Sequence, residues 1–215
     1  MTGMTGKIPD QQALWSRTYD RRVGADAEPS AFFRECAPLI PSGARVLELG
    51  CGEGTDAAAL AALGHDVTAT DFVASVIARN RHRHGDEPRL HFREMRTDEP
   101  FPFADVTFDA VYAHLTLHYF TGEVTNRIFR ELRRVLRPGG MLMFACKSDR
   151  DPLYGRGVRI EPDMFDLDGH IRHFFSESYA RACLADGFTL DRLESRTGHL
   201  FGNPSAWIIA IAHAA

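Results

Sequence analysis

The chain has 215 residues, of which 44% are hydrophobic and 25% are charged, so it holds enough apolar material for one sizeable core. Its formal net charge of −4 gives no overall basic surface for nucleic acid. No window approaches the roughly 20 consecutive apolar residues that a membrane-spanning helix needs. These observations predict one globular domain in the cytoplasm, with neither nucleic acid nor membrane as a partner.

Neither the cysteines nor the basic residues indicate a specific binding site. The four cysteines are widely separated and include no CxxC pair, so we expect no zinc site, no other metal and no disulfide framework. A dense basic run at residues 79–84 is typical of the C-terminal end of a helix, where cations are favoured. A local nucleic-acid patch is the alternative interpretation of this run.

From residue 45 onward, short apolar runs alternate with helical segments. The expected strands cover residues 45–50, 65–71, 90–94, 108–113 and 141–146, and the expected helices cover residues 55–63, 73–82 and 123–136. The third of these helices should end at Arg137-Pro-Gly-Gly140, because proline and glycine terminate helices. This alternation predicts an α/β fold with a mainly parallel sheet covered by helices on both faces.

The ends of the chain add further segments to this sheet. We expect a helical cover within residues 1–38, formed by helices at residues 11–22 and 29–36, and a cofactor-binding core at residues 39–146. The polar residues 147–175 are expected to be a loop that acts as a lid over a substrate. Residues 176–215 should then form a helix at 176–186 and strands near 188–194 and 206–212, which would pair as an antiparallel edge hairpin.

A glycine-rich loop follows the first expected strand. In the run from Glu48 to Thr55, the small residues would let a ligand approach backbone N–H groups at the start of a helix. Asp71 ends the next strand about 20 residues later, which is the spacing of a carboxylate that binds ribose hydroxyls. A nicotinamide-dependent oxidoreductase would share these features, so they predict a nucleotide-like cofactor without identifying it.

Four ordered motifs make the chain resemble the class I S-adenosylmethionine-dependent methyltransferases, over roughly residues 40–213. They are Val-Leu-Glu-Leu-Gly-Cys-Gly-Glu-Gly-Thr at residues 46–55, Asp71, Phe-Pro-Phe-Ala-Asp-Val-Thr-Phe-Asp-Ala-Val at 101–111 and Leu-Arg-Arg-Val-Leu-Arg-Pro-Gly-Gly at 132–140. The resemblance implies a Rossmann-like sheet of seven strands. More loosely, the chain is similar to small-molecule enzymes of the tellurite-resistance type.

The resemblance also implies where the cofactor is held. Gly50 and Gly52 would pass close to its amino-acid part, and the Asp71 carboxylate would accept hydrogen bonds from both ribose hydroxyls. Glu94 and Met95 are the predicted adenine contacts, with Asp98 as the alternative acid. The complete predicted cofactor set is Glu48, Gly50, Cys51, Gly52, Gly54, Thr55, Asp71, Phe72, Glu94, Met95 and His114. Phe72 would lie against the adenine face or pack beneath the sheet.

The methyl acceptor is expected at the end of the fourth strand, where doubly wound folds place ligands. His114, His118 and Tyr119 would orient the acceptor, or one histidine would remove its proton. The alternative is that His118 and Tyr119 only cap or pack against the next helix. The predicted substrate-binding residues of the cover and the lid are Tyr19, Tyr154, Arg159 and His173.

These patterns together predict a methyltransferase that uses S-adenosyl-L-methionine, releases S-adenosyl-L-homocysteine and methylates a small molecule by in-line displacement. Two rival functions remain at this point. One is a non-catalytic cofactor-binding regulatory protein, and the other is the oxidoreductase. The oxidoreductase lacks support in a Tyr-x-x-x-Lys pair, which the sequence does not contain.

Overall fold

The computed structural model describes residues 10–20 and 28–215. The last two positions of the helix expected at residues 11–22 lie outside this range. The main sheet has seven strands in the order β3-β2-β1-β4-β5-β10-β9, and its last two strands are antiparallel to their neighbours. Its strands are β1 (Arg45–Leu49), β2 (Asp66–Asp71), β3 (Leu90–Glu94), β4 (Phe108–His114), β5 (Leu136–Lys147), β9 (Phe188–Leu200) and β10 (Asn203–Ala214). The predicted α/β fold with a C-terminal antiparallel hairpin is confirmed.

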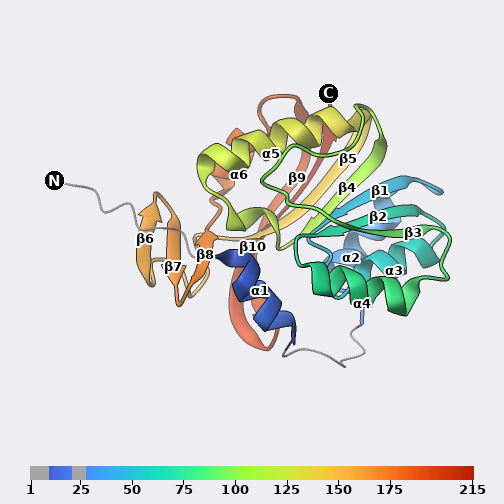
Figure 1. Cartoon of the computed structure of the whole chain (residues 1–215). Coiled ribbons are helices and arrows are strands. Elements are labelled where there is room, and N and C mark those ends of the chain that lie inside the picture. The colour runs from blue at the N-terminus through green and yellow to red at the C-terminus, as the bar shows by residue number, and fades with distance from the viewer. Residues whose placement is uncertain (1–9, 21–27) are drawn as a thin grey trace.

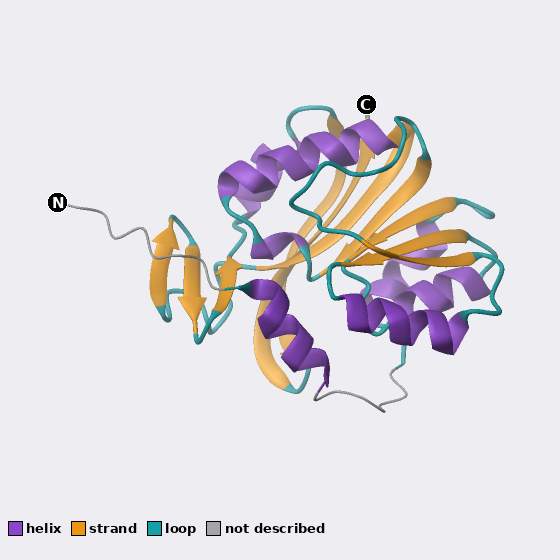
Figure 2. Cartoon of the chain, viewed as in Figure 1, coloured by secondary structure: helices purple, strands orange, loops and turns teal. Residues whose placement is uncertain are grey.

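Helices cover both faces of this sheet (Figures 1 and 2). One face packs against α2 (Ala31–Cys36), η1 (Ala37–Leu39), α3 (Thr55–Ala62) and α4 (Ala74–His84). The opposite face packs against α5 (Gly122–Val135) and α6 (Glu177–Leu184). A short turn, η2 (Leu117–Tyr119), connects β4 to α5, and α1 (Gln11–Asp20) lies apart from both helical layers. None of the helices in the described residues is long and apolar enough to cross a membrane.

Two apolar cores hold the three layers together. Leu60 and Ile77 belong to the core beneath α3 and α4, and Ile128 and Leu132 belong to the core beneath α5; all four are at most 2% exposed. Burial of each such side chain stabilises the fold by about 1.5–3 kcal/mol. The sheet is therefore buried on both faces, and the carboxyl ends of its parallel strands are left to form a site.

Helix α5 follows directly from its sequence. The Thr121 side chain caps its first turn by accepting a hydrogen bond from the Val124 backbone N–H at 3.4 Å. The helix ends at Val135. It does not extend to Arg137, because a residue that precedes a proline is disfavoured in helical conformation. Strand β5 begins at Leu136 rather than at residue 141, since Leu136 pairs with Phe108 across an irregularity in the ladder.

The C-terminal hairpin is longer than expected. The expected strands end at residue 194 and begin again at residue 206, but β9 and β10 pair from the Phe188–Ala214 partners to the Leu200–Asn203 partners, with one register shift between Ile211 and Ala212. The polar residues at 195–200 of β9 gave no alternating apolar pattern from which a strand could be predicted. An edge strand can expose polar side chains while its backbone stays paired. The tip of the hairpin reaches the ligand-binding end of the sheet (Figure 1).

The expectation of a loop at residues 147–175 is wrong. A second sheet forms there, with three antiparallel strands: β6 (Val158–Glu161), β7 (Met164–Leu167) and β8 (His170–His173). Tight turns with positive φ at Asp163 and Asp168 connect the strands. The aromatic rings of Tyr154, Phe165 and Phe174 pack together, with centroids 5.5 to 6.2 Å apart. Four-residue strands rich in polar side chains gave no apolar run from which the sequence could predict them.

Helix α1 bridges the two sheets (Figure 1). Its Gln11 amide donates a hydrogen bond to the Gly169 carbonyl in the β7–β8 turn, and its Gln12 amide donates one to the Phe72 carbonyl after β2, both at 2.8 Å. The Trp15 ring contacts the rings of Tyr119 and His170. The helix therefore lies across the carboxyl ends of the main strands, next to the three-stranded sheet.

Candidate functional site

A cavity of about 1530 Å³ opens at the carboxyl ends of β1, β2 and β4. The loop after β1, the loop after β2, α1, η2, the three-stranded sheet and the tip of the C-terminal hairpin all line it. The cavity therefore lies where doubly wound sheets bind ligands. Of the predicted cofactor and acceptor residues, it brings together Tyr19, Glu48, Gly50, Cys51, Gly52, Thr55, Asp71, Phe72, His114, His118 and Tyr119.

The loop after β1 runs close to the ligand-binding space. Gly50, Gly52 and Gly54 have φ angles of 66°, 50° and 75°, which side-chain-bearing residues rarely adopt. A Cβ atom on Gly52 would lie 3.0 Å from the Tyr19 hydroxyl oxygen of α1. Backbone conformation and close approach thus require glycine at all three positions, because a Cβ atom on Gly54 would lie 2.9 Å from the Phe92 ring. Gly50 and Gly52 line the cavity, and Gly54 does not.

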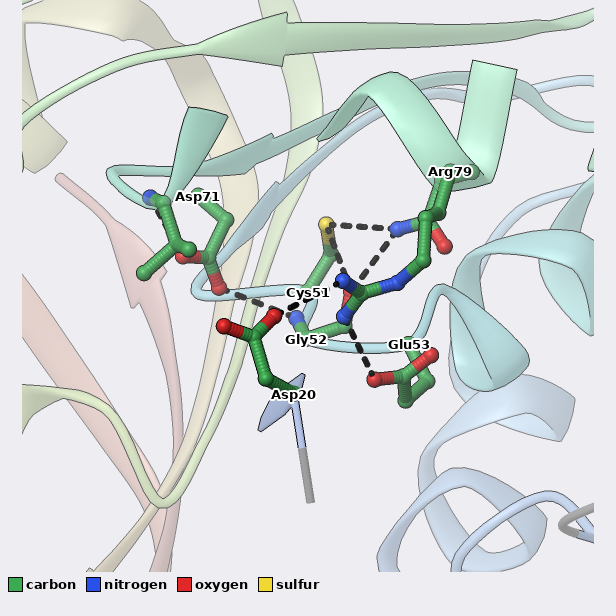
Figure 3. A network of polar contacts seen from close by, with 8 residues as sticks. Asp20, Cys51, Gly52, Glu53, Asp71 and Arg79 are labelled. Carbon is green, nitrogen blue, oxygen red and sulfur yellow. Dashed lines mark hydrogen bonds and ion pairs between the residues drawn. The ribbon is translucent and has the colours of Figure 1, made fainter. Parts of the chain in front are cut away.

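Asp71 connects this loop to the loop after β2 (Figure 3). Its Oδ2 accepts a hydrogen bond from the Gly52 backbone N–H, and its Oδ1 accepts one from the Val73 backbone N–H, both at 3.0 Å. Burial raises the pKa of this carboxyl, and the two backbone hydrogen bonds oppose that rise. The carboxylate is therefore held in one orientation at the edge of the cavity.

Side chains of α4 fix the glycine loop from outside. The Asn80 amide donates a hydrogen bond to the Gly52 carbonyl at 2.7 Å. The Arg79 guanidinium lies between Asp20 of α1 and Glu53 of the loop, at 3.4 Å and 3.3 Å (Figure 3). Part of the basic run at residues 79–84 therefore has a structural role at the site, which its position on a helix end did not reveal.

Glu48 is a buried acid with unused hydrogen-bonding capacity. Its side chain lines the cavity, the residue is only 3% exposed, and Oε2 has no hydrogen-bond partner among the described residues. Burial raises its pKa well above the ordinary range, and the nearby carboxylates of Asp56 and Asp71 add to this rise. A buried acceptor of this kind is satisfied only by a donor that enters the cavity, and a cationic donor fits it best.

Asp56, which the sequence analysis did not select, organises the floor of the cavity. Its carboxylate accepts hydrogen bonds from the Ser30 backbone N–H, the Ser30 hydroxyl and the Tyr112 hydroxyl, each at 2.7 Å. It also lies 3.8 Å from Nδ1 of His114. Its place in the first turn of α3, just after the glycine loop, was the only sequence signal available for it.

Two histidines lie near the end of β4: His114 is half-buried and ends the strand, and His118 is buried in η2. Burial lowers the pKa of His114, and Asp56 partly opposes this effect. Burial also lowers the pKa of His118 well below its ordinary value, and the positive charge of Arg172 lowers it further. The Tyr119 ring packs beside His118, with centroids 4.3 Å apart. Neutral imidazoles can accept a proton or a hydrogen bond, and they do not repel a cation.

The predicted adenine contacts differ in whether they line the cavity. Glu94 is exposed and Met95 is buried in the core beneath α5, and neither lines the cavity. The alternative acid, Asp98, does line it, together with Thr97, and accepts a hydrogen bond from Arg96 at 2.8 Å. The chain leaves β3 at Glu94 and turns toward the cavity only afterwards, which explains why counting to the end of the strand selected residues too early.

Most predicted lid residues point elsewhere. Tyr154 donates a hydrogen bond to Asp163 at 2.7 Å, the Arg159 side chain bonds the Glu161 carbonyl at 3.3 Å, and neither lines the cavity. His173 is also outside the cavity, because it packs against Tyr179. The structure instead places other residues of this segment at the cavity, which are Lys147, Pro152, Leu153, Arg156, Ile171 and Arg172.

Comparison with known proteins agrees with this geometry. Residues 47–144 match the family model described as a methyltransferase domain. A demethylmenaquinone methyltransferase from Clavibacter sepedonicus is 35% identical over 122 residues, which cover 56% of this chain and 46% of the relative. The chain thus matches less than half the length of that curated relative.

Solved methyltransferase structures share the whole fold. The 1,6-didemethyltoxoflavin-N1-methyltransferase of Burkholderia thailandensis, solved with S-adenosylhomocysteine, superposes with a TM-score of 0.72 and 21% identity over 95% of this chain and 87% of its own. TehB from Haemophilus influenzae gives a TM-score of 0.70 and 18% identity over 96% of this chain and 68% of its own. Residues 47–144 therefore match a methyltransferase domain, and the chain as a whole shares the fold of these solved structures.

The close packing of Gly50 makes a first prediction. In Gly50→Ala, the new Cβ would lie 2.7 Å from Cγ2 of Thr116, whose hydroxyl is held by the Leu49 carbonyl. We expect an affinity for S-adenosylhomocysteine at least about tenfold lower, together with a loss of about 1–3 kcal/mol in the free energy of unfolding. Calorimetry and thermal unfolding measure these two effects.

Gly43→Ala is the matched control for this substitution. Gly43 has a similar φ of 68°, but a Cβ there would meet no atom within 4 Å. It should therefore lose stability through backbone strain and keep the ligand affinity. Equal affinities of the Gly50→Ala variant and the unaltered protein would contradict the close approach of the loop to the ligand.

Proposed function

We propose that this chain transfers a methyl group from S-adenosyl-L-methionine to a small-molecule acceptor, with S-adenosyl-L-homocysteine as the product. The observation that carries the proposal is the pair of buried acids, Glu48 and Asp71, on either side of the glycine loop in one cavity. The match of residues 47–144 to a methyltransferase domain supports the same function. The assignment therefore rests on the hydrogen-bond acceptors of the site as well as on the fold.

The residues fit the parts of this cofactor. The unpartnered Oε2 of Glu48 would accept a hydrogen bond from its ammonium group, beside the backbone of residues 50–52. The Asp71 carboxylate would accept hydrogen bonds from the ribose hydroxyls. Phe72 and Asp98 would hold the adenine, with Asp98 replacing Glu94 in that role because only Asp98 lines the cavity.

The cofactor supplies a methyl group that is already activated by a positively charged sulfur. The chain would therefore act mainly by positioning the acceptor in line with that methyl group and by excluding water. His114 and His118, neutral at pH 7, would orient the acceptor or remove its proton, with Tyr119 beside them. Helix α1, with Trp15 and Tyr19 toward the cavity, and the three-stranded sheet would form the cover and lid over the acceptor.

The ribose contact gives the direct test of cofactor binding. Asp71→Ala removes a charged acceptor, and we expect it to weaken the binding of S-adenosylmethionine and S-adenosylhomocysteine by about 100-fold or more. Titration calorimetry measures this loss. Asp66→Ala is the matched control, because Asp66 begins the same strand and is exposed at its other end. NADH serves as the ligand control.

Three outcomes of this titration are informative. Micromolar binding of both sulfur ligands that is lost only in Asp71→Ala would support the proposal. Tighter binding of NADH than of the sulfur ligands, or an unchanged affinity of Asp71→Ala for the sulfur ligands, would contradict the proposal. Turnover with a panel of acceptors then separates an enzyme from a regulatory protein that only binds the cofactor.

The raised pKa of Glu48 predicts a proton linked to binding. Burial favours the protonated form of this acid in the free protein, whereas an ammonium group beside it favours the carboxylate. Binding should therefore release a proton at pH values between the pKa of Glu48 in the complex and its pKa in the free protein, and the affinity should increase with pH across that interval. Calorimetry in buffers of different ionisation enthalpy measures the released proton.

Two variants control for other titrating groups. Glu48→Gln should abolish the proton release and flatten the dependence of affinity on pH. Glu94→Gln should retain both, because Glu94 is exposed and outside the cavity. Proton uptake on binding, or release that persists in Glu48→Gln, would show that Glu48 is not the coupled acid.

A further inference from the structure

Charge is distributed unequally between the two halves of the cavity. All of the acids among its described lining residues come from the first part of the chain: Asp10, Glu28, Glu48, Glu53, Asp56, Asp71 and Asp98. The same part supplies one lining cation, Arg96, which is paired with Asp98 at 2.8 Å. From residue 114 onward, the described lining residues include no acid, but they include Lys147, Arg156 and Arg172. The half built by residues 10–98 is therefore acidic, and the half built by β4, the three-stranded sheet and the hairpin is basic.

Two of these three cations have no acid among the described residues to neutralise them. Lys147 is paired, because its Nζ lies 2.7 Å from Oδ2 of the buried Asp151. In contrast, Arg172 and Arg156 form no ion pair with any acid in the part of the chain that the structure describes. Arg172 is half-buried on β8, and this strand packs against η2, which carries His118.

A half-buried guanidinium without an acid is suited to an anion that enters from outside. Arginine presents a rigid fork of N–H donors that matches carboxylate and phosphate oxygens. Trp15, Tyr119 and Phe120 line the cavity from other elements and provide apolar surface for the rest of such a ligand. The acidic half already suits the sulfonium and ammonium cations of the proposed cofactor, so the basic half serves the other substrate.

We propose that the methyl acceptor carries an oxyanion, a carboxylate or a phosphate, and that Arg172 binds it with Arg156 as the second cation. This proposal rests on the proposed function and names the class of its acceptor. The anion would anchor the acceptor at β8 and leave its nucleophilic atom beside His114 and His118. Phosphate and carboxylate share the chemistry of recognition, and the experiment distinguishes them.

The test measures the binding of simple oxyanions to the protein saturated with S-adenosylhomocysteine. Benzoate is compared with benzamide, which has the same shape without the charge, and phenyl phosphate and inorganic phosphate are the other probes. Calorimetry and tryptophan fluorescence follow binding, since Trp15 lines the cavity. We expect benzoate or phenyl phosphate to bind at least about tenfold more tightly than benzamide, with an affinity that falls as salt increases.

Variants assign this preference to the arginine. Arg172→Gln should remove it, and Arg172→Lys should retain part of it because the charge remains. Arg159→Gln is the matched control, since Arg159 lies on β6 of the same sheet, is exposed and does not line the cavity. Circular dichroism establishes that each variant is folded.

Several results would overturn the proposal. They are equal binding of benzoate and benzamide, no detectable binding of any oxyanion at millimolar concentration, and a preference that survives in Arg172→Gln. A fourth result is that Arg172→Gln lowers the affinity for S-adenosylhomocysteine but not the affinity for 5′-methylthioadenosine, which lacks the amino-acid part. Arg172 would then bind the carboxylate of the cofactor rather than that of the acceptor. Failure of the unaltered protein to bind S-adenosylhomocysteine would instead contradict the proposed function, and the oxyanion preference is still measurable without it.

Discussion

The two hydrogen bonds that Asp71 accepts hold the site together. One comes from Gly52 in the loop after β1, and the other comes from Val73 at the start of α4. Because β1 and β2 are parallel neighbours, their carboxyl ends meet at this acid, and its buried carboxylate fixes the distance between the two loops. The glycine conformations, the contacts of Asn80 and Arg79, and the position of α1 above Phe72 all depend on that arrangement.

Burial and charge give the two ends of the cavity different chemistry. At one end, burial and the nearby carboxylates of Asp56 and Asp71 raise the pKa of Glu48, and a cation that enters favours the carboxylate form of Glu48. At the other end, burial keeps His118 neutral and the unpaired Arg172 adds positive charge. In the proposed function, this polarity would orient the cofactor and the acceptor in one cavity.

The sequence predicted the sheet because each parallel strand is a short apolar run bounded by turn residues. It also selected the glycine loop and Asp71, since their spacing follows from the geometry of adjacent parallel strands. It missed the three-stranded sheet, whose strands are only four residues long, and the extended hairpin, where the second half of β9 carries mostly polar side chains. It also missed Asp56 and Arg172, because only tertiary contacts reveal which acid lies buried beneath His114 and which arginine lacks an acid.

The measurement that tests the account most directly is a crystal structure of the protein with S-adenosylhomocysteine. The account predicts the ribose hydroxyls within hydrogen-bond distance of Asp71 and the ammonium group beside Oε2 of Glu48. It also predicts that Arg172 remains free of contact with this ligand. A ligand bound outside the cavity, or one whose ribose lies away from Asp71, would contradict the account.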